Sequence, residues 1–171
     1  IWGMKLGKFD GSKPVIMLTA CIHGERVASF YLIDFLRRLT DNSPKWRSEL
    51  DALKDAYDFY AVPVVTPSTF ISGQRPNWNG VDINRNFDYK WEEYDPGSDP
   101  NRQKGDAPFS EAESRAIRDL VLAHKPFVVI DIHDWGGLRN HSFYHVEGTD
   151  SRQLAYADSL DENLRRSLPM Y

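Results

Sequence analysis

The feature that most constrains the fold is an apolar run, Val15 to Ile22, that ends in the tripeptide His23-Gly24-Glu25. A run rich in Val, Ile, Met and Leu is typical of a strand in a parallel sheet that is covered on both faces. After it the apolar spacing becomes helical, and one stripe is formed by Ala28, Tyr31, Leu32, Phe35, Leu36 and Leu39. His23 and Glu25 are therefore predicted at the carboxyl end of a strand, where open α/β sheets bind their ligands.

A second apolar run ends in the same way. Residues 127–132 are mostly Val and Ile, and His133 follows them directly. One histidine at a strand end is more often a satisfied polar group than a ligand. Two of them at one sheet edge, with Glu25 beside the first, favour a metal site. Two imidazoles and one carboxylate leave a fourth position open on zinc, which is the pattern of catalytic rather than structural sites.

The rest of the chain predicts an alternation of strands and helices. We expect strands over 1–6 and 58–65, and helices over 26–39, 44–53, 110–124 and 151–167. Ser110 and Glu113 form a capping-box pattern at the start of the 110–124 helix. The polar segment 66–105 is predicted to be a long functional loop. This order indicates an α/β fold with a mostly parallel mixed sheet and helices on both faces.

The composition limits the classes of function that this protein can have. The 171 residues suffice for one domain, and a net charge of −4 without a basic stripe argues against a nucleic-acid partner. No apolar run has the length of a membrane span, so we expect a soluble protein with no membrane partner. We expect no signal peptide within these residues, and the compartment and the oligomeric state stay open. The one cysteine, Cys21, is predicted to be a buried apolar residue rather than a nucleophile.

Two arginines stand in the polar segment, Arg75 and Arg85. They are either solvated loop residues or guanidinium groups for an anionic substrate and a developing oxyanion. The residues alone do not separate these two interpretations.

Three motifs together resemble the zinc carboxypeptidases of the carboxypeptidase A type. They are His23-Gly24-Glu25, the segment Gly80-Val81-Asp82-Ile83-Asn84-Arg85-Asn86-Phe87, and Asp131-Ile132-His133. The segment Ala107-Pro108-Phe109-Ser110-Glu111 is also similar to that family. The motifs occur in the family's order across nearly the whole chain.

The resemblance implies a role for each matching residue. His23, Glu25 and His133 would bind one Zn²⁺ ion, and Asp82 would orient His23. Asn84 and Arg85 would hold the C-terminal carboxylate of a peptide substrate. Arg75 would stabilise the oxyanion of the tetrahedral intermediate.

The chain departs from the family pattern at three points. The family places two residues between its first histidine and its glutamate, whereas only Gly24 intervenes here. A one-residue deletion assigns Glu25 as the ligand; an ungapped count would assign Arg26, which cannot bind a cation. Thr66-Pro67-Ser68-Thr69 replaces the family's Asn-Pro-Asp-Gly. The family's general-base glutamate and mobile tyrosine are expected after Tyr171, so residues 1–171 are interpreted as one catalytic domain that is incomplete at both ends.

The function expected from these residues is hydrolysis of the C-terminal peptide bond of a peptide. Two alternatives within the fold are a zinc amidohydrolase acting on N-acyl amino acids and a peptidase for cell-wall peptides. A third is a binding module that keeps the fold without competent chemistry, which the short His-Gly-Glu spacing and the missing general base favour.

Overall fold

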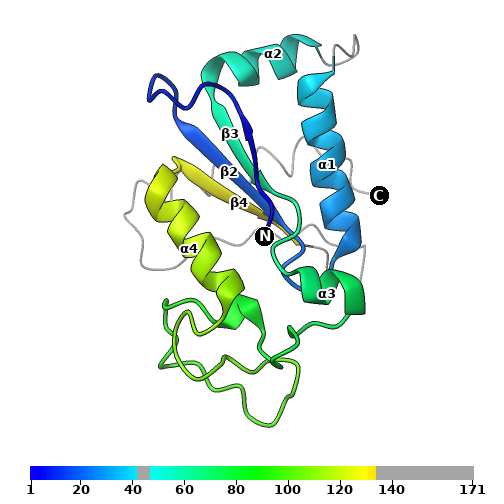
Figure 1. The fold of residues 1–171 in the computed structure, drawn as a ribbon, viewed down its shortest axis with the longest axis vertical. Helices are drawn as coiled ribbons and strands as arrows, with labels where there is room; N and C mark the ends of the chain where they lie inside the picture. The colour runs from blue at the N-terminus through cyan, green and yellow to red at the C-terminus, as the bar shows by residue number, and fades with distance from the viewer. Residues whose placement is uncertain (42–46, 134–171) are drawn as a thin grey trace, which may run out of the picture. The chain divides into compact units, whose positions relative to one another are not determined.

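The structure is a computed structural model, and it describes residues 1–41 and 47–133. Its helices and strands follow the predicted alternation (Figure 1). In chain order they are β1 (Met4–Leu6), β2 (Val15–Ala20), α1 (Arg26–Thr40), α2 (Arg47–Ala56), β3 (Asp58–Val62), α3 (Pro67–Ser72), the 3₁₀ helix η2 (Ile83–Arg85), α4 (Ala112–His124) and β4 (Val128–Ile132).

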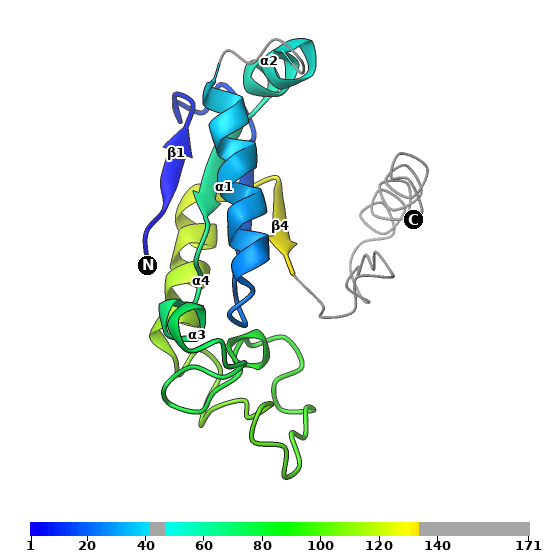
Figure 2. The same ribbon diagram turned by 90° about the vertical axis from the view of Figure 1, so that its right-hand side faces the viewer.

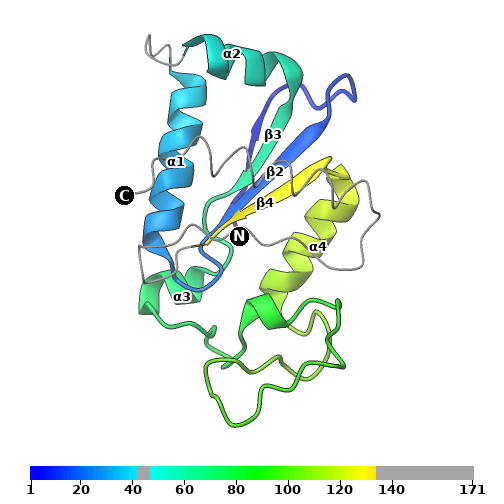
Figure 3. The same cartoon turned by 180° about the vertical axis from the view of Figure 1, so that it is seen from behind.

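Within the described residues the strands form one sheet in the order β1-β3-β2-β4. β2 pairs in parallel with β3 and with β4, and β1 pairs with β3 antiparallel. Figure 3 shows β2 and β4 running side by side in the same direction. The predicted mostly parallel mixed sheet is confirmed.

Helices cover both faces of the sheet, because successive strand residues point to opposite sides. Leu18 and Ala20 pack with α1, whose buried residues include Leu32 and Leu36. Met17, one residue along β2, packs with residues of α4 and η2 on the other side. α2 lies across the end of α1 (Figure 2).

The parallel pairing of β2 with β4 brings the two strand-end histidines to one edge of the sheet. Thr19 pairs with Asp131 and Ala20 with Ile132, so the chain leaves both strands at the same level. Cys21 has a φ of +59°, which turns the chain out of β2 two residues before His23. The strand therefore ends two residues earlier than the apolar run predicts.

The prediction of one long loop over residues 66–105 is wrong in part, because this segment contains α3 and η2. α3 begins with Pro67 in its first turn and ends at Gly73, which adopts the left-handed conformation that favours glycine. Asp82 caps η2 by accepting a hydrogen bond from the Asn84 N–H. Both helices are too short to show an apolar period in the sequence.

Three further expectations are wrong in detail. The N-cap of α4 is Glu111, without a side-chain cap bond, so Ser110 and Glu113 do not form the predicted capping box. Tyr31 is 69% exposed, because it lies one residue before the buried position Leu32 and thus about 100° around the helix. A run as apolar as β4 is typical of a buried strand, but Val129 and Ile130 are exposed because β4 lies at one edge of the sheet among the described residues.

Two predicted segments lie outside the described residues: the first three residues of the 44–53 helix and the whole 151–167 helix. Among the helices of the described ranges, none combines the length and apolarity needed to cross a membrane.

Candidate metal centre

The turn between β2 and α1 places His23 and Glu25 on the same side of the chain. Gly24, between them, has a φ of +79°, and a Cβ atom there would lie 2.6 Å from the carbonyl oxygen of Thr69 in α3. Glu25 folds back on His23: one carboxylate oxygen accepts the His23 backbone N–H at 2.7 Å, and the other lies 3.1 Å from Nδ1 of the ring. Position 24 therefore requires glycine, because another residue would be strained at this φ and its Cβ atom would clash with α3.

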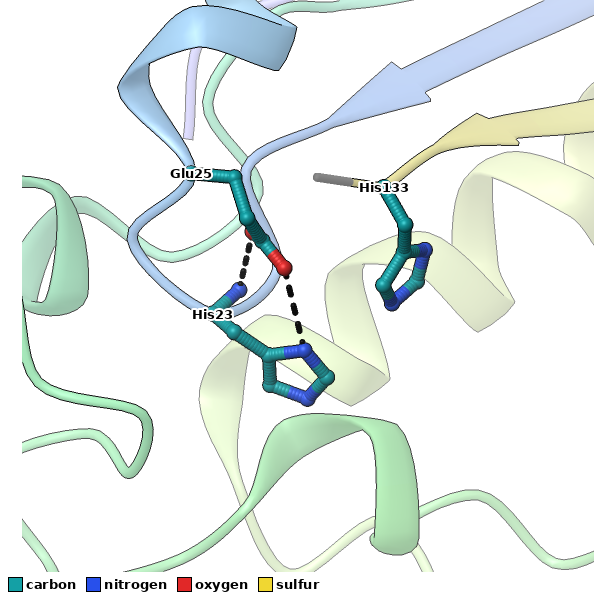
Figure 4. A group of neighbouring side chains, drawn as sticks. All are labelled: His23, Glu25 and His133. Atoms are coloured by element: carbon teal, nitrogen blue, oxygen red, sulfur yellow. Dashed lines mark hydrogen bonds and ion pairs between the residues drawn. The ribbon is translucent and has the colours of Figure 1, made fainter. Parts of the chain in front are cut away.

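His133 completes a cluster of three ligand groups (Figure 4). One ligand atom from each of His23, Glu25 and His133 lies within 4.8 Å of the others. The two imidazole rings meet edge to face, with their centroids 5.2 Å apart. Two ring nitrogens and a carboxylate are a donor set that suits zinc, so the residues present fit the ion that the sequence motifs imply.

Arg26, the alternative to Glu25 at the ligand position, points elsewhere. Its guanidinium donates to the carbonyl oxygens of Phe70 and Ile71 at 2.8 and 2.9 Å. These bonds hold the first turn of α1 against α3. The geometry thus favours Glu25 as the partner of His23.

Asp82 is fully buried and binds two residues of the site at once. One carboxylate oxygen lies 2.7 Å from Nε2 of His23, and the other accepts from Nε of Arg75 at 2.9 Å. The contact with Nε2 leaves Nδ1 of His23 facing Glu25. A carboxylate in this position fixes the ring orientation of a metal-binding histidine.

Charges and hydrogen bonds shift the pKa values of this group consistently. Burial alone would raise the pKa of Asp82, but the contacts with His23 and Arg75 outweigh it and lower that pKa. Burial likewise opposes ionisation of Glu25, and the hydrogen bonds from His23 lower its pKa. For His23, burial disfavours the imidazolium, but the bonds to Asp82 and Glu25 raise the pKa above the ordinary value. The two carboxylates are therefore ionised at neutral pH.

The substrate-binding candidates, Asn84 and Arg85, lie on η2. The Asn84 backbone N–H donates to Asp82, whereas the Asn84 side chain is exposed. Arg85 lies with its guanidinium 5.2 Å from the ring centroid of Tyr94. Both residues line a cavity of about 500 Å³, together with Phe87, Tyr89, Lys90, Trp91 and Tyr94. No contact in the described part of the chain joins Arg85 to the histidine–glutamate cluster directly.

The sequence did not single out a buried polar network that joins this segment to α4. Its buried members are Asn77, Asn86, Glu111 and Ser114. Asn86 lies in the Asn-Arg-Asn segment and Glu111 in the Ser-Glu pair before α4, but nothing in the spacing of these segments pairs one with the other. Cys21 is buried as expected, and burial raises the pKa of its thiol.

Comparison with known proteins identifies the family to which the chain is similar. The profile of the zinc carboxypeptidase family matches residues 1–169. Mouse mast cell carboxypeptidase A is 27% identical over 72% of this chain and 34% of its own length. Carboxypeptidase B of the crayfish Astacus astacus is 27% identical over 71% of this chain and 45% of its own length.

Among solved structures, thrombin activatable fibrinolysis inhibitor superposes with a TM-score of 0.74. The match covers 98% of this chain and 48% of that protein at 21% identity, so it shows the shared fold. The chain spans between about a third and a half of the curated relatives that it matches. Because the family profile covers nearly every residue, the chain belongs to the zinc carboxypeptidase family.

Proposed function

We propose that this protein is a zinc-dependent metallocarboxypeptidase that hydrolyses the C-terminal peptide bond of peptides with a free carboxylate. The observation that carries the proposal is the convergence of His23, Glu25 and His133 from two neighbouring parallel strands. Zinc bound there would act as a Lewis acid on the scissile carbonyl and lower the pKa of a bound water to about 7.

Arg85 is the group that would select a free carboxylate. Its Nε is buried and is among the few buried side-chain atoms of the described residues without a hydrogen-bond partner. An unpaired buried donor is costly, whereas the planar guanidinium binds a carboxylate through two parallel hydrogen bonds. The cavity beside Arg85 has room for a residue-sized ligand, and Asn84 at its rim would add an amide donor.

Arg75 would stabilise negative charge that develops on the substrate carbonyl oxygen. Two of its nitrogens, Nε and Nη2, lie 2.9 and 2.8 Å from one oxygen of Asp82. A guanidinium has five N–H donors, and its side chain here is one-third exposed, so further donors remain for a substrate. Asp82 holds the arginine in place before substrate arrives, which is the preorganisation that electrostatic catalysis requires.

The test compares two substrates and two variants of the zinc-loaded protein. We expect hydrolysis of an N-acyl dipeptide with a free carboxylate in preference to its C-terminal amide. Arg85→Ala removes the bidentate contact and should reduce this preference by about 100-fold, the scale of one charge-assisted hydrogen-bonded pair.

Arg102→Ala is the matched control. Arg102 lies on the same long segment, is half exposed and pairs with Asp99, so its loss should leave the preference unchanged. Full retention of the preference in Arg85→Ala would remove the proposed specificity. Tight zinc binding without turnover of either substrate would favour the binding module over the hydrolase.

A further inference from the structure

Glu111 is a buried carboxylate, 7% exposed, at the N-cap of α4. One of its oxygens accepts two amide N–H donors, from Asn77 at 2.8 Å and from Asn79 at 2.7 Å. The other oxygen accepts from the Ser110 hydroxyl at 3.1 Å. Burial opposes its ionisation, but these three donors and the charge of Arg115 outweigh burial and lower its pKa. The carboxylate is thus ionised at neutral pH and tied to the 77–79 turn.

Through Asn77, Glu111 fixes the chain just before η2. The Asn77 side-chain oxygen accepts the backbone N–H groups of Asn79 and Val81 at 3.0 and 3.1 Å. The Asn77 backbone N–H donates to the Val81 carbonyl at 2.9 Å, which closes the turn. Val81 precedes Asp82, the carboxylate that holds both His23 and Arg75.

Through Asn86, Glu111 fixes the chain just after η2. Asn86 follows Arg85 directly, and its side-chain oxygen accepts the Glu111 N–H at 3.0 Å. The same oxygen accepts the Ser114 hydroxyl at 2.6 Å. The Asn86 amide nitrogen donates to the carbonyls of Lys104 and Ala107 and to the Ser110 hydroxyl.

The surroundings of Asn86 leave it little freedom. It is fully buried, and a Cβ atom added at Gly105 would lie 2.7 Å from its amide nitrogen. Every donor and acceptor of its side chain has a partner, so displacing it breaks several buried hydrogen bonds together. The backbone that carries Asn84 and Arg85 is therefore held at both ends by contacts that meet at Glu111.

We propose that Glu111 is a positioning residue for the substrate carboxylate: it sets η2 between two anchored asparagines so that Asn84 and Arg85 face the cavity in one arrangement. Glu111 itself touches no reacting group. The inference rests on the proposed function, because that function assigns the carboxylate to Asn84 and Arg85.

The experiment measures affinity rather than turnover. N-benzoylglycine and its amide are titrated into the zinc-loaded protein, and the acid-to-amide affinity ratio is compared among variants, with Arg85→Ala as the reference without a preference. Glu111→Gln keeps the size of the side chain but removes the negative charge that accepts the amide N–H groups of Asn77 and Asn79. We expect its ratio to fall about tenfold, since misplacement of a positioned group by about 1 Å has costs of this order or larger. Zinc content should stay at about one ion per chain.

Two further variants separate positioning from stability. Glu113→Gln removes a charge from the first turn of the same helix outside this network and should leave the ratio unchanged. Asn77→Asp combined with Glu111→Gln exchanges the amide and the carboxylate across the 2.8 Å contact and should restore most of the ratio. If Glu111→Gln fails to fold, Asn79→Ala removes one of the two amide donors at an exposed position, and a smaller loss in the same direction is expected.

The results that overturn the inference differ from those that overturn the function. Glu111→Gln with a lower melting temperature but the wild-type ratio would show a purely structural role. Equal losses in Glu111→Gln and Glu113→Gln would show an effect of helix-terminal charge alone. A wild type without acid preference would overturn the carboxylate site itself, and this inference with it.

Discussion

Gly24 explains how a histidine and a glutamate separated by one residue can face the same point. Its positive φ of +79° reverses the chain, so Glu25 returns to within 3.1 Å of the His23 ring. The turn uses the left-handed conformation, which glycine adopts without steric cost.

Gly24→Ala is therefore expected to destabilise the protein and to weaken zinc binding. The added methyl group would meet the Thr69 carbonyl oxygen at 2.6 Å in a conformation that already strains alanine. We expect a loss of about 1–3 kcal/mol in the free energy of unfolding, measured by urea denaturation.

Gly11→Ala separates the effect of backbone strain from the effect of the clash with Thr69. Gly11 has a similar φ of +84°, but a Cβ atom there meets nothing within 4 Å. It should show the backbone strain without the clash and should leave zinc affinity unchanged. Equal effects of the two substitutions would contradict a specific role for the contact between the Gly24 turn and α3.

At the scale of elements, the N-terminus of α4 and the segment around η2 form one polar unit. The helix terminus favours a negative charge, and Glu111 supplies it while accepting the two asparagine amides. The unit is held by buried hydrogen bonds in addition to the apolar packing of Ile83 and Ile117, so part of its stability depends on the charge state of one carboxyl group.

This dependence predicts how stability changes with pH. The pKa of Glu111 is lowered in the folded protein, so its contribution is fully present above its unfolded pKa of about 4.3 and is lost as pH falls through the folded value. Glu111→Gln should cost about 2 kcal/mol at neutral pH, the scale of hydrogen bonds to a charged group. The difference from wild type should shrink below about pH 4.3. Urea denaturation at neutral and acidic pH checks this, and a difference that stays constant with pH would contradict it.

Part of this unit could be predicted from the sequence and part could not. The α4 helix follows from its apolar spacing, and Ile117 on that helix is buried. The N-cap of α4 could not be predicted from the sequence. Ser110 and Glu113 match the capping-box pattern, but in the structure Ser110 forms hydrogen bonds with Asn86 and Glu111. A local pattern cannot show that a residue 24 positions away competes for the same hydroxyl.

At the scale of the whole molecule, the parallel sheet brings together candidate metal ligands that are more than a hundred positions apart in the sequence. β2 and β4 are neighbours, so the residues after them leave the sheet at one edge. This convergence was predictable, because the histidines that follow two apolar runs reach the same edge of the sheet when the two strands are parallel and adjacent. The roles of Arg75 and Asp82 needed the family resemblance, since loop residues carry no period that would place them.

The contact between Asp131 and His133 belongs to the same sheet edge. Nδ1 of His133 lies 2.5 Å from the Asp131 carboxylate, and Thr19, the partner of Asp131 in register, donates to the other oxygen. Neighbouring strands thus supply both a candidate ligand and the groups that orient it. The site depends on the assembled sheet rather than on any one segment.

The most direct test of the account is the zinc stoichiometry and affinity of the purified protein, measured by elemental analysis and by competition with a chromophoric chelator. We predict about one zinc ion per chain, and loss of tight binding in His133→Ala, because two protein ligands do not make a stable tetrahedral site. His124→Ala, which removes the histidine at the far end of α4, should bind zinc as the wild type does. A wild type that takes up no zinc, or a His133→Ala variant with unchanged affinity, would contradict the claim that His23, Glu25 and His133 share one ion.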